Sequence, residues 1–197
     1  MNIQILSRNL KLREFDKRRL EIAAGEIKRL ERIVEDVLDF ARPLQMNKTS
    51  CSVNEVLRKC FNLLQDSIPH KNIQVIKKMS RVLKNVSIDS EMMEQAFLNI
   101  ILNAIEAMPS GGTLEIVTRK TERAGREMIL IDVQDSGIGM NQEQLAKAFD
   151  PFYTTKTTGV GLGLSNVKKI IEAHEGIIEV ESQAAQGSTF RILLPLE

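Results

Sequence analysis

The sequence has few of the residues that build metal and redox sites. Among its 197 residues there are two cysteines, Cys51 and Cys60, and two histidines, His70 and His174. Neither cysteine lies in a Cys-x-x-Cys motif, so we expect reduced cytosolic thiols with no metal or redox role. Two histidines so far apart in the chain also argue against a histidine-rich metal site.

Charge and hydropathy argue against two further classes of protein. The net charge is +1, and no basic block with interleaved aromatic residues suggests a nucleic-acid partner. No apolar run approaches the roughly 18–20 residues of a membrane span, and no signal-peptide pattern opens the chain. The remaining composition, 43% hydrophobic and 27% charged, fits one globular domain, or a domain with a smaller helical element.

The first part of the chain is predicted to be helical. Apolar residues recur there at alternating steps of three and four, the pattern of a helical bundle. This seam comprises Leu20, Ala23, Ile27, Leu30, Val34, Val37 and Ala41, and a shorter one comprises Ile3, Leu6 and Leu10. We predict an antiparallel helical hairpin over residues 1–43, with its first helix cut short at Met1 and its second ended by Pro43.

One hairpin cannot bury this much apolar surface alone. We therefore expect a second copy of the chain to supply two more helices and complete a four-helix bundle. The alternative is that the hairpin packs on its own globular domain.

Residues 44–197 show a mixed pattern, with a domain boundary near residues 42–48. Strands and helices are intermixed without regular βαβ alternation, which predicts an α+β two-layer sandwich. The predicted helices span residues 52–65, 90–108, 141–149 and 163–174, the first with Ser52 and Glu55 in capping-box spacing. The predicted strands span residues 72–78, 85–89, 112–120, 127–135, 176–182 and 187–196.

Two asparagines lie on one face of the apolar helix predicted over residues 90–108. Asn99 and Asn103 are four residues apart, and a buried amide needs a hydrogen-bond partner. Their carboxamide oxygens suit Mg²⁺, which shares its ligand shell with water and phosphate. Bonds to backbone or water are the alternative.

A second motif, DSGIGM, follows the strand predicted over residues 127–135. It combines the carboxylate of Asp135 with Gly137 and Gly139, which would let a flat ligand approach the backbone. An ordinary Asp-Ser-Gly turn is the alternative.

The third motif is a glycine-rich segment before the helix predicted over residues 163–174. A helix N-terminus binds phosphate readily, and Lys156 adds a positive charge close by. A solvent-exposed linker is the alternative. Neither the P-loop pattern nor the dinucleotide-binding glycine pattern occurs in the chain.

The order of these motifs resembles that of sensor histidine kinases, members of the ATPase superfamily that includes DNA gyrase. Asn99 and Asn103, then DSGIGM, FDPFYTTK, GVGLGLS and GSTF resemble their N box, first glycine box, F box, second glycine box and terminal Gly-Thr element. The AFDPFYTTK stretch is most similar to the nitrogen-regulator branch. Residues 18–43 resemble the second helix of their dimerisation and phosphotransfer domain.

The resemblance implies an ATP site with Mg²⁺ at its phosphate end. Asn103 would ligate the Mg²⁺ that bridges the ATP phosphates, with Asn99 beside it, and Lys156 would approach the γ-phosphate. The residues that would close over the phosphates are Gly161, Leu162, Gly163 and Leu164.

At the base end, Asp135 would accept a hydrogen bond from the exocyclic amine of adenine, a contact that selects adenine over guanine. Gly137 and Gly139 would line the base pocket, and Thr189 would support its wall.

The resemblance also implies a lid, residues 154–160, that closes over the nucleotide. Phe149 and Phe152 would anchor it, and we expect it to be poorly ordered without ATP.

Two positions depart from the family pattern. Val160 stands where many relatives have threonine, so one lid hydroxyl is missing. Glu106 occupies a position that is basic in some branches, which leaves phosphate neutralisation to Lys156 and Mg²⁺.

The phosphoacceptor motif of the family, His-Glu followed by Asn-Pro, is absent from the sequence. His70 and His174 are expected to be structural or solvated. We expect the acceptor histidine to belong just before Met1, so that this chain would bind ATP without being able to phosphorylate itself.

The resulting hypothesis is the ATP-binding catalytic portion of a cytoplasmic sensor histidine kinase, a homodimer whose partner is the receiver domain of a response regulator. The membrane would be reached only through regions outside this chain. Gyrase-like ATPases instead place a water-activating glutamate at the position of Asn99. Two further hypotheses are a serine-directed anti-sigma kinase, which would need no helical hairpin, and a non-catalytic nucleotide-binding dimerisation module.

Overall fold

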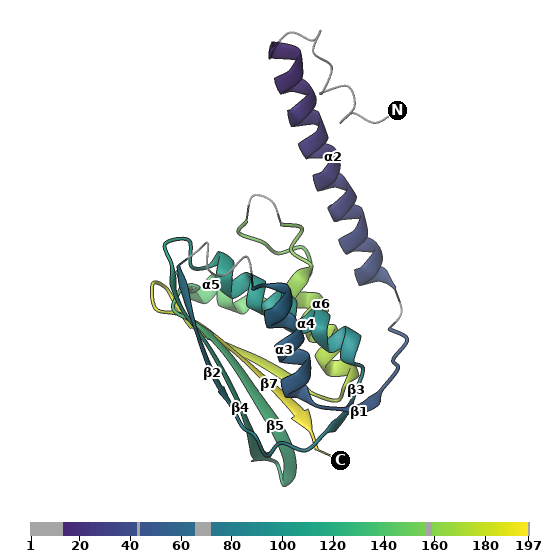
Figure 1. The fold of residues 1–197 in the computed structure, drawn as a ribbon, viewed down its shortest axis with the longest axis vertical. Helices are drawn as coiled ribbons and strands as arrows, with labels where there is room; N and C mark the ends of the chain where they lie inside the picture. The colour runs from purple at the N-terminus through teal and green to yellow at the C-terminus, as the bar shows by residue number, and fades with distance from the viewer. Residues whose placement is uncertain (1–13, 43, 66–71, 157–158, 197) are drawn as a thin grey trace.

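A computed structural model of the chain describes residues 14–42, 44–65, 72–156 and 159–196. It contains one long helix, α2 (Glu14–Ala41), and a two-layer α+β domain (Figure 1). The domain has the predicted fold class. The helix predicted near residues 1–10, as well as Pro43 and His70, lies outside the described residues.

The domain is built on a five-stranded mixed sheet. Its order is β2 (Ile73–Met79), β4 (Gly112–Arg123), β5 (Arg126–Asp135), β7 (Gly187–Pro195) and β6 (Ile177–Gln183). β2 runs parallel to β4, and the other neighbours are antiparallel. The hairpin between β4 and β5 turns at Ala124 and Gly125, both with positive φ, as a two-residue hairpin loop requires.

A second, two-stranded sheet lies at the start of the domain. β1 (Thr49–Cys51) pairs antiparallel with β3 (Val86–Ile88). The sequence did not predict β1, because a three-residue strand shows too little alternation to be recognised.

Three helices cover one face of the large sheet: α3 (Val53–Leu63), α4 (Ser90–Glu106) and α6 (Gly163–Ala173) (Figure 1). Their apolar sides and the inner face of the sheet form one core. The short α5 (Gln142–Ala146) lies beside them. Ser52 is the N-cap of α3 but makes no side-chain cap bond, so the predicted capping box is wrong in that detail.

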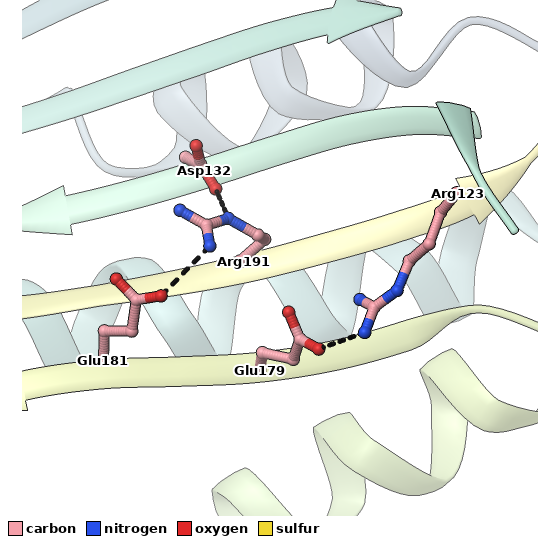
Figure 2. A network of polar contacts seen from close by, with 5 residues as sticks. All are labelled: Arg123, Asp132, Glu179, Glu181 and Arg191. Carbon is pink, nitrogen blue, oxygen red and sulfur yellow. Dashed lines mark hydrogen bonds and ion pairs between the residues drawn. The ribbon is translucent and has the colours of Figure 1, made fainter. Parts of the chain in front are cut away.

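The opposite face of the sheet carries a network of charged side chains (Figure 2). Arg191 on β7 bonds Asp132 on β5 at 3.0 Å and Glu181 on β6 at 3.1 Å. Arg123, at the end of β4, reaches Glu179 on β6 at 2.7 Å. Exposed pairs of this kind add little stability, so they keep this face hydrated rather than holding the fold together.

The predicted seam of α2 is not covered by the rest of the described chain. Ile27, Leu30, Val34 and Val37 are between 38% and 58% exposed. Among the described residues, no helix is both long and apolar enough to cross a membrane.

Candidate functional site

A cavity of about 630 Å³ opens between α4, the N-terminus of α6 and the residues before that helix, namely Tyr153, Thr154, Lys156, Gly159, Val160 and Gly161. It falls within the roughly 300–1,000 Å³ that small-molecule sites occupy. Helix α2 borders it with Gly25, Glu26 and Ile33. Most of the residues predicted for the phosphate end line this cavity: Asn99, Asn103, Lys156, Gly161, Leu162, Gly163 and Leu164.

The N-terminus of α6 reaches this cavity because two positions are glycine. Gly161 has φ +79°, and a Cβ there would come within 2.6 Å of backbone atoms of Phe152. A Cβ on Gly163 would lie 3.3 Å from Asn99 Oδ1, so the first turn of α6 sits directly beside that amide. Within the described part of the chain no side chain caps α6, so its first N–H groups are available to an anion.

The side chain of Lys156 lies beside the C-terminal turn of α4. Its ammonium donates to Asn103 Oδ1 at 2.5 Å and forms an ion pair with Glu106, one turn further along the same helix. The predicted magnesium ligand and the predicted phosphate-binding lysine are thus together. Glu106 was not predicted to hold this lysine, although its i, i+3 spacing from Asn103 could have revealed the role.

The oxygen atoms at this end suit a hard cation. Asn103 and Glu106 already hold a positive group between them, and carboxamide and carboxylate oxygens are ligands that Mg²⁺ prefers. Within the described ranges, no group of three or more His, Cys, Asp and Glu side chains could hold a metal alone. The Asn103 and Glu106 oxygens would suit a metal ion that takes its remaining ligands from a phosphate.

Asp135 lies at the end of β5 and is 3% exposed. Its Oδ1 accepts from the Gly137 N–H at 2.8 Å. Burial raises the pKa of this carboxyl, and the backbone N–H groups of Gly137 and Ser188 oppose that rise. The carboxylate is therefore a fixed acceptor in an apolar setting.

Two glycines after Asp135 permit close backbone contacts. A Cβ on Gly137 would come within 2.4 Å of the Ala107 carbonyl at the end of α4, and Ile138 donates to that carbonyl at 3.0 Å. A Cβ on Gly139 would come within 2.0 Å of the Gln183 carbonyl. The DSGIGM segment is thus tied both to β6 and to the helix that carries Asn103.

Thr189, which was predicted to support the wall of the base pocket, is not the strand partner of Asp135. β7 pairs Ser188 with Asp135 and Thr189 with Gln134, and alternation turns these two pairs to opposite faces. Ser188 is buried, and its hydroxyl lies 2.9 Å from that of Ser182. Strand alternation in the sequence could have identified Ser188 as the neighbour of Asp135.

The two phenylalanines predicted to anchor the lid differ in their surroundings. Phe149 is partly buried against the core. Phe152 is 62% exposed and has φ +66°, and its ring lies 6.4 Å from that of Phe40 on α2, edge to face. Thr157 and Thr158, in the middle of the predicted lid, lie outside the described residues.

Contacts between α6 and the end of α2 were not foreseen from the sequence. Lys169 Nζ donates to the carbonyls of Phe40 at 2.9 Å and Arg42 at 3.1 Å. A cation at the last carbonyls of a helix is favourable. This lysine therefore fastens the C-terminal end of α2 to the domain.

His174 is a structural residue. It is buried, with Nδ1 at 2.8 Å from the Ile170 carbonyl and Nε2 accepting from the Asp89 N–H at 2.9 Å. The ring must therefore be neutral, with its proton on Nδ1. Burial lowers the pKa of His174, which agrees with this state.

Comparison with known proteins places these features in a family. Residues 88–197 match the family described as histidine kinase-, DNA gyrase B-, and HSP90-like ATPase. Sporulation kinase C of Bacillus subtilis (strain 168) is 38% identical over 179 residues, which cover 90% of this chain and 41% of that protein. Sensor histidine kinase ZraS of Salmonella typhimurium is 34% identical over 176 residues, 89% of this chain and 37% of ZraS. The chain thus spans about two fifths of the length of these curated relatives.

Solved structures agree with the sequence relatives. The catalytic domain of histidine kinase ThkA aligns with a TM-score of 0.68 and 32% identity, over 76% of this chain and 96% of that domain. Histidine kinase ThkA in complex with the response regulator protein TrrA aligns with a TM-score of 0.75 and 29% identity, over 98% of this chain and 55% of that one.

Proposed function

The chain belongs to the histidine kinase-, DNA gyrase B- and HSP90-like ATPase family, in its histidine kinase branch, and we propose that it transfers the γ-phosphoryl group of ATP to a histidine. The observation that carries this proposal is the cavity in which Asn103, Lys156 and the uncapped N-terminus of α6 face one another. These are an oxygen ligand, a cation and a set of N–H donors, the three groups that a triphosphate requires.

The adenine ring would bind at the Asp135 end of the site. A buried carboxylate held by backbone N–H groups can accept from an exocyclic amine, which adenine has at a position where guanine has an oxygen. Gly137 and Gly139 let the segment after Asp135 pack tightly against the Ala107 and Gln183 carbonyls, which fixes the backbone beside the carboxylate.

The phosphates would bind at the other end, where Asn103, with Asn99 beside it, would hold Mg²⁺. The metal would neutralise the charge that develops on the phosphates during transfer. Lys156 would bind the γ-phosphoryl group, and the first N–H groups of α6 would orient the chain of phosphates.

Asn99 favours a kinase over an ATP-hydrolysing machine. Hydrolysis needs a group that orients and deprotonates water, and a neutral amide is no base. In the structure Asn99 lies against the first turn of α6, where it can position the phosphate-binding segment.

The acceptor would be a histidine outside this chain. His174 is buried with both ring nitrogens engaged, so it cannot reach a γ-phosphate. We propose that the exposed seam of α2 pairs with a second copy in a helical bundle that presents the acceptor, and that a response-regulator receiver domain takes the phosphoryl group from it.

The test is to mix the chain with γ-labelled ATP, Mg²⁺ and a separate phosphotransfer domain that carries a histidine. We expect acid-labile, base-stable label on that domain, lost when its histidine is replaced and absent with Asn103→Ala. ATP binding without any labelled histidine would instead support a non-catalytic nucleotide-binding module, and release of inorganic phosphate alone would support an ATPase.

A further inference from the structure

Helix α4 presents two side-chain oxygens to a single cation. Asn103 and Glu106 lie one turn apart, and the ammonium of Lys156 contacts both Asn103 Oδ1 and Glu106 Oε2. We call these two atoms the α4 oxygen pair. The lysine comes from the lid, 50 residues beyond Glu106 in the chain.

The contact between Lys156 and the α4 oxygen pair is weak enough for another cation to replace the ammonium. The side chains of Lys156 and Glu106 are 42% and 50% exposed, so water screens their attraction. An exposed ion pair of this kind holds its partners by at most about a fivefold bias. A compact divalent ion that prefers amide and carboxylate oxygens can therefore displace the ammonium.

The same geometry explains how a glutamate is tolerated beside a triphosphate. Without a bound cation, the negative charge of the Glu106 carboxylate would repel the phosphates. Near a protein surface this repulsion is about four times stronger than at the same distance in bulk water, because charges are screened less well there. Lys156 or a metal ion removes that repulsion. Glu106 thus needs a cation whenever a nucleotide is present.

We propose that Glu106 joins Asn103 as a protein ligand of the divalent cation that accompanies the nucleotide, and that Lys156 competes with this cation for the α4 oxygen pair. The inference rests on the proposed function, because it concerns the same nucleotide site. Arrival of the metal releases Lys156, which then neutralises the phosphates. The metal thus replaces Lys156 on the α4 oxygen pair, and Lys156 moves to the phosphates, in one step of nucleotide binding.

The experiment is calorimetric titration of the chain with a non-hydrolysable ATP analogue, once with Mg²⁺ and once with EDTA. The quantity of interest is the magnesium effect, the ratio of the dissociation constant in EDTA to that in Mg²⁺. We expect Glu106→Gln to lower the magnesium effect roughly tenfold, because a metal ligand is lost while the repulsion of the metal-free analogue falls. Glu143→Gln is the matched control, since Glu143 is an exposed glutamate paired with Lys147 outside the cavity.

Competition has its own variant. Lys156→Met removes the ammonium but keeps the apolar stem, so it should weaken binding in both buffers while raising the magnesium effect about two- to fivefold. A magnesium effect that falls or stays constant in this variant would contradict the competition.

Asn103→Ala separates the role of Glu106 from the proposed function. A normal magnesium effect in Glu106→Gln, together with a reduced one in Asn103→Ala, overturns the role of Glu106 and leaves the proposed function standing. A normal magnesium effect in Asn103→Ala would overturn the metal assignment of the proposed function itself.

Discussion

The two ends of the proposed nucleotide site are built differently. At the base end, Asp135 is almost fully buried and is held by backbone N–H groups of Gly137 and Ser188. At the phosphate end, the contacts join exposed side chains of α4 and the lid. Backbone contacts cannot rearrange without disturbing the sheet, whereas side chains in water can. In the proposed site, the base end would therefore be preformed for selectivity and the phosphate end would be adjustable.

The largest effect should follow from a change at the preformed end. Asp135→Asn keeps the size of the side chain but replaces a carboxylate oxygen with an amide N–H donor, which would face the adenine amine in the proposed complex. We expect ATP affinity to fall about 100-fold, because a buried acceptor is lost where water cannot replace it. Calorimetry measures the affinity, and an unchanged melting temperature shows that the fold is intact. Unchanged affinity would refute the adenine assignment.

A smaller effect, on stability alone, should come from the far end of α4. His174 binds the Asp89 backbone next to the N-terminus of α4 and is away from the cavity. His174→Gln should lower the free energy of unfolding by about 1–3 kcal/mol, since two buried hydrogen bonds are weakened. Thermal unfolding measures this loss, and the magnesium effect on nucleotide affinity should not change.

The same residue predicts how stability depends on pH. Burial, and to a lesser degree the charge of Lys48, lower the pKa of His174, while the Ile170 carbonyl and Asp89 oppose this. The folded state then binds fewer protons than the unfolded state, so stability falls as the pH drops below about 6.5. The loss should disappear in His174→Gln and persist in the control His70→Gln. If stability still falls at low pH in His174→Gln, the titration of other groups must cause the loss.

The smallest effect should appear where α2 meets the domain. Lys169→Met keeps the stem of the side chain but removes the ammonium from the Phe40 and Arg42 carbonyls. The last turn of α2 should lose about 0.3–1 kcal/mol of protection, measured by amide hydrogen exchange near residues 36–41. Lys168→Met is the control, because Lys168 pairs weakly with Glu172 at 3.9 Å. Equal changes in the two variants would show that Lys169 does not fasten the helix.

Much of the fold follows from local pattern. Period-two alternation located β4, β5, β6 and β7, and the 3.6-residue period located α3, α4 and α6, because each signal lies within a few residues. The family predicted from the order of five motifs is confirmed. The assignment to the nitrogen-regulator branch stays a prediction.

The rest depends on contacts between distant residues. Lys156 meets Glu106 across 50 positions, and the Asp89 backbone meets His174 across 85. No local period reports such pairs, since chain folding alone brings them together. The neighbour of Asp135 on β7 is a different case. Strand alternation within the sequence could have indicated that Ser188, and not Thr189, lies beside Asp135.

The most direct test of the two-ended site compares adenosine with ATP on the unmodified chain, each titrated calorimetrically with Mg²⁺ and with EDTA. We predict that adenosine binds weakly and equally in both buffers, because it occupies only the preformed base end. ATP should bind tightly only with Mg²⁺. Adenosine affinity that depends on Mg²⁺, or ATP affinity that does not, would contradict this division of the site.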